Sequence, residues 1–134
     1  MRTARPLRRL MHSAGGLSSA GASIERVLLP TMRIERCRQC DDDGWGVCRH
    51  GERCVIDDDL GSLIDKIASA DMAVFATPVY WSELSESLRA FLDRARRIAF
   101  HAREKSPLKG KRAFGICVAG RGGGGSYGCA RSPR

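Results

Sequence analysis

Residues 71–97 have the sequence DMAVFATPVYWSELSESLRAFLDRARR, and this stretch decides the fold class of the chain. The apolar run Met72 to Ala76 shows no alternation with polar residues, which is typical of a parallel strand covered on both faces of its sheet. We expect the strand to stop at Thr77-Pro78, because proline cannot donate a hydrogen bond to a neighbouring strand. The Tyr80-Trp81 pair then lies in a loop at the carboxyl end of a buried strand.

A helix is expected after this loop. Its apolar residues recur every three or four positions and form one stripe, which consists of Leu84, Leu88, Phe91, Leu92, Ala95 and Ile98. In open α/β sheets, ligands bind at the edge where the strands end. The loop between this strand and this helix is therefore a candidate binding loop.

Strands and helices also alternate upstream of this stretch. Helical stripes are predicted for residues 7–14 and 60–68, and a strand is predicted for residues 24–29. Three aspartates at 57–59 precede the second helix, where carboxylates cap the first turn and oppose the helix dipole. These aspartates lack the ligand spacing of a calcium loop, so we interpret them as caps.

Downstream, a strand is predicted for residues 112–119, and it opens into a glycine-rich segment over 120–134. The whole pattern predicts an α/β fold with a parallel sheet and helices on both faces. Residues 1–134 are expected to form a single domain, which is short for a complete five-stranded sheet of this kind.

The charge distribution argues against a nucleic-acid-binding protein. The net charge is +8, and the basic residues concentrate in the two ends of the chain, where no aromatic residues are interleaved with them for base stacking. No apolar run is long enough to span a membrane, and the basic N-terminus is not followed by the apolar core of a secretion signal. We therefore expect a cytoplasmic protein without nucleic-acid or membrane partners.

The segment 37–54 is rich in cysteine, glycine and aspartate and poor in aliphatic residues, so something other than core packing is expected to order it. Its pattern C-x2-C-x7-C-x5-C is formed by Cys37, Cys40, Cys48 and Cys54. Four thiolates so close in sequence suit one iron-sulfur cluster or one zinc ion, and reduced thiols or a disulfide stay open as alternatives. Of the three histidines, only His50 lies near enough in sequence to replace a cysteine ligand.

Taken together, several motifs resemble the flavodoxin-like NADPH-dependent FMN reductase family, in particular its iron-sulfur flavoprotein-like branch. Besides the cysteine-rich segment, the motifs are Cys54-Val-Ile-Asp-Asp-Asp, Ala70-Asp71, Thr77-Pro78-Val79-Tyr80-Trp81, Leu88-Arg-Ala-Phe-Leu-Asp-Arg94, Leu108-Lys-Gly-Lys111 and Ala119-Gly120. The resemblance implies a flavodoxin-like fold, an FMN cofactor and, at the four cysteines, a [4Fe–4S] cluster. The seven-residue spacing between the second and third cysteine is longer than usual for that branch.

The resemblance also implies which residues hold FMN. They belong to the proline-aromatic loop and the glycine-rich loop, and they are Thr77, Pro78, Val79, Tyr80, Trp81, Ala119, Gly120, Gly122 and Gly123. Aromatic rings give a flat apolar wall for the isoalloxazine ring system, and glycine lets backbone N–H groups approach it. The implied function is a flavin-dependent NAD(P)H oxidoreductase that passes electrons to a small acceptor such as a quinone, or to the cluster.

The chain departs from the family pattern at both ends. We expect it to lack the first strand with its phosphate-binding loop, and also the last strand, so that FMN binds weakly and exposed strand edges favour a homo-oligomer. Two rival interpretations follow from the same sequence. One is a non-catalytic zinc- or cluster-binding module built on residues 37–54, and the other is an inactive fragment of a reductase.

Overall fold

The computed structural model describes residues 21–50, 53–81 and 83–119 of the chain. The predicted helix 7–14 and the glycine-rich segment 120–134 lie outside these ranges. The described elements are the 3-10 helices η1 (Leu29–Thr31), η2 (Gly46–His50) and η3 (Arg103–Lys105), the α-helices α2 (Leu60–Ser69) and α3 (Glu86–Ala102), and the strands β1 (Met72–Tyr80), β2 (Glu83–Leu84) and β3 (Arg112–Ala119). Both predicted α-helices within the described ranges are confirmed.

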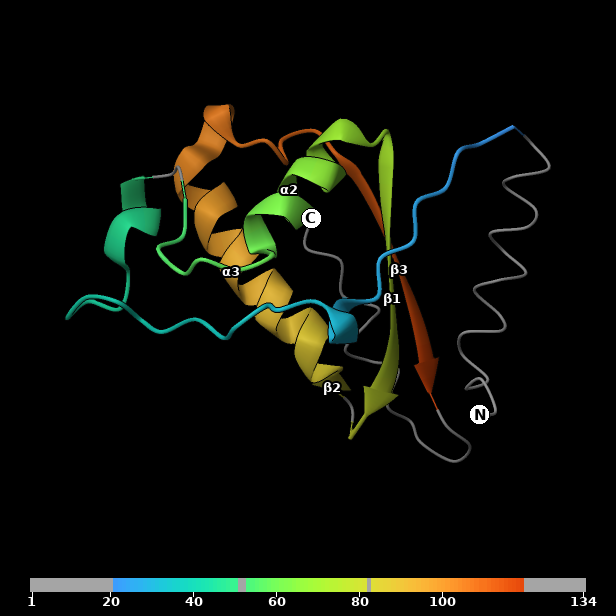
Figure 1. Cartoon of the computed structure of the whole chain (residues 1–134), viewed down its shortest axis with the longest axis horizontal. Coiled ribbons are helices and arrows are strands. Elements are labelled where there is room, and N and C mark those ends of the chain that lie inside the picture. Colours follow the sequence, from blue (N-terminus) through green and yellow to red (C-terminus); the bar gives the residue numbers. More distant parts are fainter. Residues whose placement is uncertain (1–20, 51–52, 82, 120–134) are drawn as a thin grey trace.

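The three strands form one sheet in the order β2-β1-β3. Strands β1 and β3 pair in parallel along their whole shared length, from Met72 opposite Arg112 to Val79 opposite Ala119. Strand β2 adds a short antiparallel pairing at the end of β1. The parallel pair joined through α3 confirms the α/β class and is consistent with a flavodoxin-like fold (Figure 1).

Strand β1 continues through Thr77-Pro78 to Tyr80, so the prediction that it stops at the proline was wrong. Within the described residues, β1 has β3 on one side along almost its full length, but β2 on the other side only at Val79 and Tyr80. A proline is tolerated in such a strand where its nitrogen faces a side without a hydrogen-bonding neighbour.

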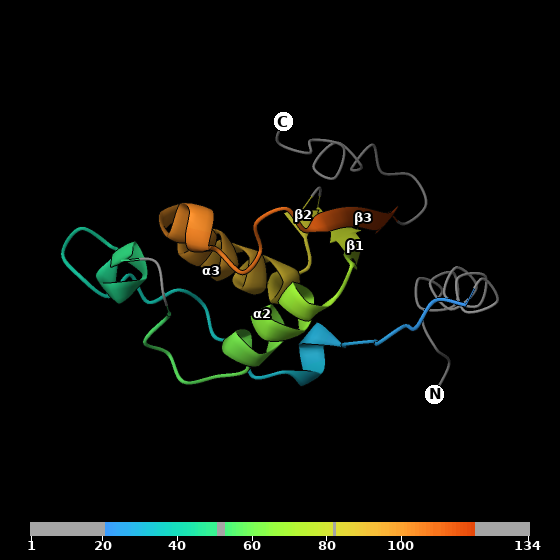
Figure 2. The same ribbon diagram turned by 90° about the horizontal axis from the view of Figure 1, so that it is seen from above.

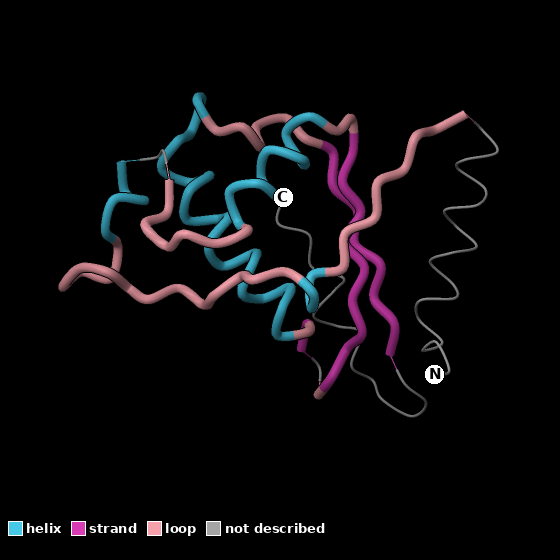
Figure 3. The backbone as a smooth tube through the Cα atoms, in the orientation of Figure 1, coloured by secondary structure: helices cyan, strands magenta, loops and turns pink. Residues whose placement is uncertain are grey.

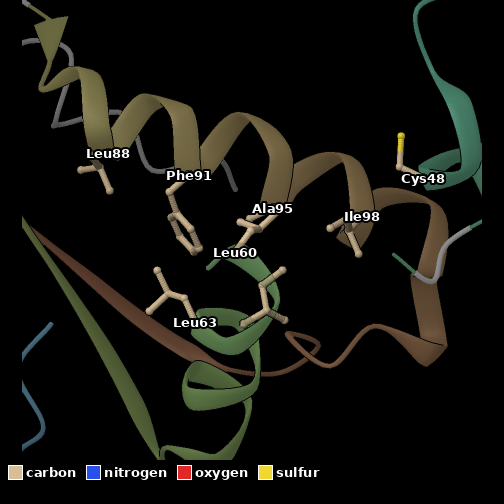
Figure 4. Packing of buried hydrophobic residues seen from close by; sticks show 8 residues of the cluster. Cys48, Leu60, Leu63, Leu88, Phe91, Ala95 and Ile98 are labelled. Atoms are coloured by element: carbon tan, nitrogen blue, oxygen red, sulfur yellow. The ribbon is translucent and has the colours of Figure 1, made fainter. Parts of the chain in front are cut away.

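The core lies between the sheet and the two α-helices, which both cover the same face (Figure 2). Its buried members are Cys48, Leu60, Leu63, Ile64, Leu88, Phe91, Ala95 and Ile98. Figure 4 shows Phe91 and Ala95 of α3 directed toward Leu60 and Leu63 of α2. The sheet contributes Phe75, whose ring centroid lies 5.8 Å from that of Phe91.

The other face of the sheet is exposed. Met72 and Val74 on β1 are 41% and 45% exposed, and Phe114 on β3 is 59% exposed. Burial therefore alternates along β1, and the expectation that this strand is covered on both faces was wrong for the described part of the molecule. The apolar run did not reveal this, because its outward residues are as apolar as its inward ones.

The predicted strand at residues 24–29 is not formed. This segment runs as loop, drawn as a pink tube in Figure 3, and ends in the short helix η1. A strand requires a partner for its backbone groups, and none of the described strands pairs with it. The chain is instead attached at the following residues, where the N–H groups of Arg33 and Glu35 donate to the carboxylates of Asp59 (2.7 Å) and Asp58 (2.9 Å).

Candidate functional site

The strand pairing brings the two predicted flavin-binding loops to one edge of the sheet. Val79 lies opposite Ala119, so the polypeptide leaves β1 and β3 at adjacent positions. This is the edge at which open α/β sheets bind ligands. The predicted residues Gly120, Gly122 and Gly123 lie outside the described part of the chain.

The aromatic pair lies at this edge, and no helix or strand of the described ranges covers it. Tyr80 is 63% exposed and Trp81 is 98% exposed. Trp81 also has a φ of +51°, in the left-handed region that side chains with a Cβ atom rarely adopt. Backbone strain of this kind persists where the surrounding structure imposes it, and it is common in ligand-binding loops. Pro78 and Val79 are half-buried within β1.

The side chain of Thr77 is directed into the protein, where its hydrogen bonds hold the Tyr80-Trp81 loop. Its side chain is buried, its hydroxyl oxygen accepts the N–H of Ser85 at 3.1 Å, and its O–H donates to the Ser85 hydroxyl oxygen at 2.9 Å. The Ser85 carbonyl in turn accepts the N–H of Arg89 at the start of α3. Thr77 thus ties the end of β1 to the start of α3, on either side of the exposed aromatic pair.

The cysteine-rich segment docks at the far end of α3. Cys48 in η2 is buried within the core, Cys37 and Cys54 are partly buried, and Cys40 is exposed. Packing therefore helps to order this segment, which corrects the expectation from its composition. Cys40 also approaches Gly46 so closely that a Cβ atom at Gly46, which has a φ of +73°, would lie 2.9 Å from the Cys40 Cβ.

Trp45 and Arg97 hold the segment on the helix. The Arg97 guanidinium lies 4.6 Å from the centroid of the Trp45 ring, and its Nη1 donates to the Gly44 carbonyl at 2.7 Å. The Trp45 ring also meets the His101 ring edge-on, with 4.5 Å between the ring centroids. His50, the histidine that sequence proximity favours, is exposed. Sequence spacing did not indicate His101, because this residue reaches the cysteine-rich segment only through the position of α3 in the folded chain.

Asp58 and Arg94 form a buried ion pair beneath the same segment. Their side chains are 0% and 1% exposed, and Arg94 Nη1 donates to Asp58 Oδ2 at 2.5 Å. Asp58 also accepts the N–H groups of Glu35 and Leu60, while Arg94 donates to the Glu35 carbonyl at 3.0 Å. The interpretation of the aspartates as helix caps is incomplete, because Asp58 joins three parts of the chain.

The hydrogen bonds of this pair determine its charge state. Burial by itself would raise the pKa of Asp58, but hydrogen bonds from Arg94 and from two backbone N–H groups lower it below the ordinary value of 3.8. Burial would lower the pKa of Arg94, whereas hydrogen bonding to Asp58 and interaction with the Cys54 thiol raise it. Both residues are therefore charged at neutral pH.

The thiol of Cys48 behaves differently. Burial raises its pKa, the neighbouring Cys54 adds to this effect, and Arg97 acts against it. The thiol is within hydrogen-bonding distance of the Trp45 carbonyl, at 2.8 Å. As placed, the described residues include no group of three or more His, Cys, Asp or Glu side chains arranged to hold a metal ion. No described helix is long and apolar enough to cross a membrane.

Comparison with known proteins shows the family to which the chain belongs. The family described as NADPH-dependent FMN reductase matches residues 3–128. An iron-sulfur flavoprotein of Methanosarcina thermophila is 30% identical over 105 residues, which are 78% of this chain and 51% of that protein. An iron-sulfur flavoprotein of Methanocaldococcus jannaschii is 30% identical over 91 residues, which are 66% of this chain and 45% of that protein.

A protein of Bacillus subtilis, named as an NAD(P)H-dependent FMN-containing oxidoreductase, is 34% identical over 68 residues, which are 48% of this chain and 38% of that protein. The chain thus spans about half the length of the curated relatives it matches, or less. No solved structure matches it significantly. The match over residues 3–128 shows that the chain belongs to the NADPH-dependent FMN reductase family, where it groups with the iron-sulfur flavoproteins.

Proposed function

We propose that this protein is an FMN-dependent NAD(P)H oxidoreductase, which binds flavin at the edge formed by Val79 to Trp81 and Ala119. A second part of the proposal is that Cys37, Cys40, Cys48 and Cys54 hold a [4Fe–4S] cluster that receives electrons from the flavin. A quinone or another small molecule is the proposed alternative acceptor. The protein is proposed to act in the cytoplasm.

The exposure of Trp81 is the observation that carries the flavin proposal. A tryptophan that is 98% exposed leaves its whole ring in water, which is unfavourable for an apolar surface of this size. It stands at the end of β1, beside the point where β3 ends. A planar ring system stacked there would cover the Trp81 and Tyr80 side chains, and this supports the assignment of both residues to the cofactor.

The protein's part in the reaction is positioning. Bound FMN supplies hydride and single-electron transfer, which no amino-acid side chain provides. Tyr80 and Trp81 would hold the ring, and the backbone after Ala119 would approach its polar edge. Thr77, through Ser85, keeps the Tyr80-Trp81 loop at a fixed distance from the start of α3.

Flavin binding provides the test. Titration of the purified chain with FMN is expected to quench the flavin fluorescence and to saturate. Replacement W81A should weaken the affinity by up to about tenfold, since an aromatic pair contributes roughly 0.5–1.5 kcal/mol. The matched control is F100A, because Phe100 is an aromatic residue that is 67% exposed near the opposite end of α3. An absence of saturable quenching in the wild type would disprove the flavin proposal.

The chemistry of the cysteine segment fits an anionic metal group. Four sulfur atoms come from one segment, and the buried atoms Arg94 Nε and Arg97 Nε of the adjacent helix have no hydrogen-bond partner among the described residues. The sulfur atoms would have to move together to bind one metal group. None of these features depends on flavin binding at the edge of the sheet. They therefore also suit a second candidate function, a zinc- or cluster-binding module without catalysis. Metal analysis with an anaerobic absorbance spectrum distinguishes the two.

A further inference from the structure

Strand β3 contains a cysteine that takes part in a disulfide bond. Cys117 is disulfide-bonded, whereas the four cysteines of the segment 37–54 are free thiols. The sequence contains six cysteines, and the sixth is Cys129, which lies outside the described part of the chain. Within one chain, this count leaves only Cys129 as the partner of Cys117.

The position of Cys117 connects this bond with the proposed flavin edge. Cys117 lies two positions before the end of β3 and is paired with Thr77, whose buried hydroxyl holds Ser85. Phe114 and Ile116 of the same strand are 59% and 36% exposed on the open face of the sheet. Side chains alternate along a strand, so half-buried Cys117 lies on the face that the helices cover, beside the anchor of the aromatic loop.

The segment between the two cysteines is rich in glycine. Six of the nine residues 120–128 are glycine, which loses more conformational freedom on ordering than any other residue. When such a segment contacts a ligand, the free energy of ordering it weakens the binding. A covalent bond between its two ends removes many of its conformations before the ligand arrives. A disulfide between Cys117 and Cys129 would thus prepare the segment for binding.

We propose that Cys117 and Cys129 form a reversible disulfide, which ties the glycine-rich segment 120–128 to the end of β3 and strengthens flavin binding there. The effect on flavin rests on the proposed function, whereas the disulfide does not. Oxidation by a small disulfide such as oxidised glutathione joins the two cysteine sulfur atoms. Two electrons and two protons pass from the cysteine thiols to glutathione, which leaves as two thiols. Because cytoplasmic disulfides are mostly transient or regulatory, the bond makes flavin affinity respond to the surrounding thiols.

Peptide mapping tests the disulfide directly. The full chain is incubated with oxidised or with reduced glutathione, its free thiols are alkylated, and it is digested with trypsin without reduction. Cleavage after Arg112, Arg121 and Arg131 places Cys117 in peptide 113–121 and Cys129 in peptide 122–131. We expect mass spectrometry to find these peptides joined after oxidation and separately alkylated after reduction. A non-reducing gel should show the oxidised chain as a monomer.

Titration with FMN tests the effect on flavin. The oxidised wild type is expected to bind FMN roughly three- to tenfold more tightly than the reduced wild type. C129S lacks one of the two thiols, so it should bind like the reduced wild type in both glutathione buffers. The matched control is S132A, which changes a nearby residue, keeps both thiols and should respond to glutathione like the wild type. If C129S is unfolded by circular dichroism, the two forms of the wild type decide the question.

The outcomes separate this inference from the proposed function. If both cysteines are alkylated after oxidation, or if either is joined to another peptide or to a second chain, the disulfide proposal is disproved. Equal or weaker FMN binding by the oxidised form disproves the effect on flavin, even where the disulfide is present. If neither form binds FMN, the flavin proposal fails and this effect fails with it, while the peptide map still decides whether the disulfide exists.

Discussion

Asp58 illustrates how a single residue joins separate parts of this chain. Its carboxylate accepts hydrogen bonds from Arg94 and from the backbone of Glu35 and Leu60, and its side chain is fully buried. Replacing one member of a buried ion pair leaves the other charge without compensation, which costs about 3–5 kcal/mol. We therefore expect D58N to lower the free energy of unfolding, as measured by urea unfolding, by about 3–5 kcal/mol, which is a large share of the roughly 5–15 kcal/mol of a typical domain.

The same residue predicts how stability depends on pH. The pKa of Asp58 is lowered in the folded chain from its ordinary value of 3.8. The stabilisation is fully present above the unfolded pKa and is lost as the pH falls through the lower folded pKa. The free energy of unfolding of the wild type should thus decrease below about pH 3.8 more steeply than that of D58N.

A double variant tests whether the unpaired charge of Arg94, and not the replacement of Asp58 as such, destabilises D58N. In D58N/R94M the buried cation is removed together with its partner, and buried pairs replaced by neutral residues often cost little. The double variant is expected to be more stable than D58N alone. Additive destabilisation by the two replacements would show that the ion pair itself is not the cause.

At the scale of elements, the link between β1 and α3 is the feature on which the proposed flavin loop depends. Thr77 and Ser85 bracket the exposed aromatic pair, and T77V removes the hydroxyl without changing the shape of the side chain. The N–H of Ser85 then loses its acceptor, at a cost of roughly 1–3 kcal/mol. We predict a lower urea midpoint for T77V and a weaker FMN affinity, whereas T77S should behave like the wild type. Equal midpoints for T77V and T77S would refute this role of the hydroxyl.

The elements also show what could be predicted from the sequence. The helical stripes at 60–68 and 84–98 specify α2 and α3, because each buries one apolar side regardless of what covers the sheet. The segment 24–29 has a strand composition but no described partner, and a strand depends on pairing that its own residues do not encode. The proline at position 78 was misjudged for the same reason, since its effect depends on which side of β1 is paired.

The parts of the candidate site that local motifs specify could be predicted from the sequence. The contacts that depend on where α3 runs in the folded chain could not. The meeting of Val79 and Ala119 at one edge follows from two parallel strands, and it was expected. Three residues of α3 contact the region around the cysteine-rich segment without belonging to any sequence motif, and they are Arg94, Arg97 and His101. In the sequence they look like part of the polar side of an amphipathic helix. Arg94 is buried because it pairs with Asp58, and Arg97 is partly buried where Trp45 docks on α3.

At the scale of the whole molecule, the exposed face of the sheet is the main feature without a described partner. It carries Met72, Val74, Phe114 and Ile116, all at least 36% exposed. Val74 is paired with Phe114, and Met72 and Ile116 each lie two positions away on the same strands, so the four side chains share one face of the sheet. Contiguous apolar surface of this kind marks interaction sites in soluble proteins.

We predict that two copies of the chain associate through this face, in line with the expected homo-oligomer. Two such faces bury apolar side chains against one another, and a lysine introduced at the centre would have to be desolvated without a partner. The sedimentation coefficient of the wild type should therefore depend on protein concentration. F114K should raise the dissociation constant of the dimer at least about tenfold, which corresponds to roughly 1.4 kcal/mol. The control is L28K, because Leu28 is 53% exposed but belongs to the loop that leads into η1. If F114K and L28K sediment like the wild type, the association, where present, uses another surface.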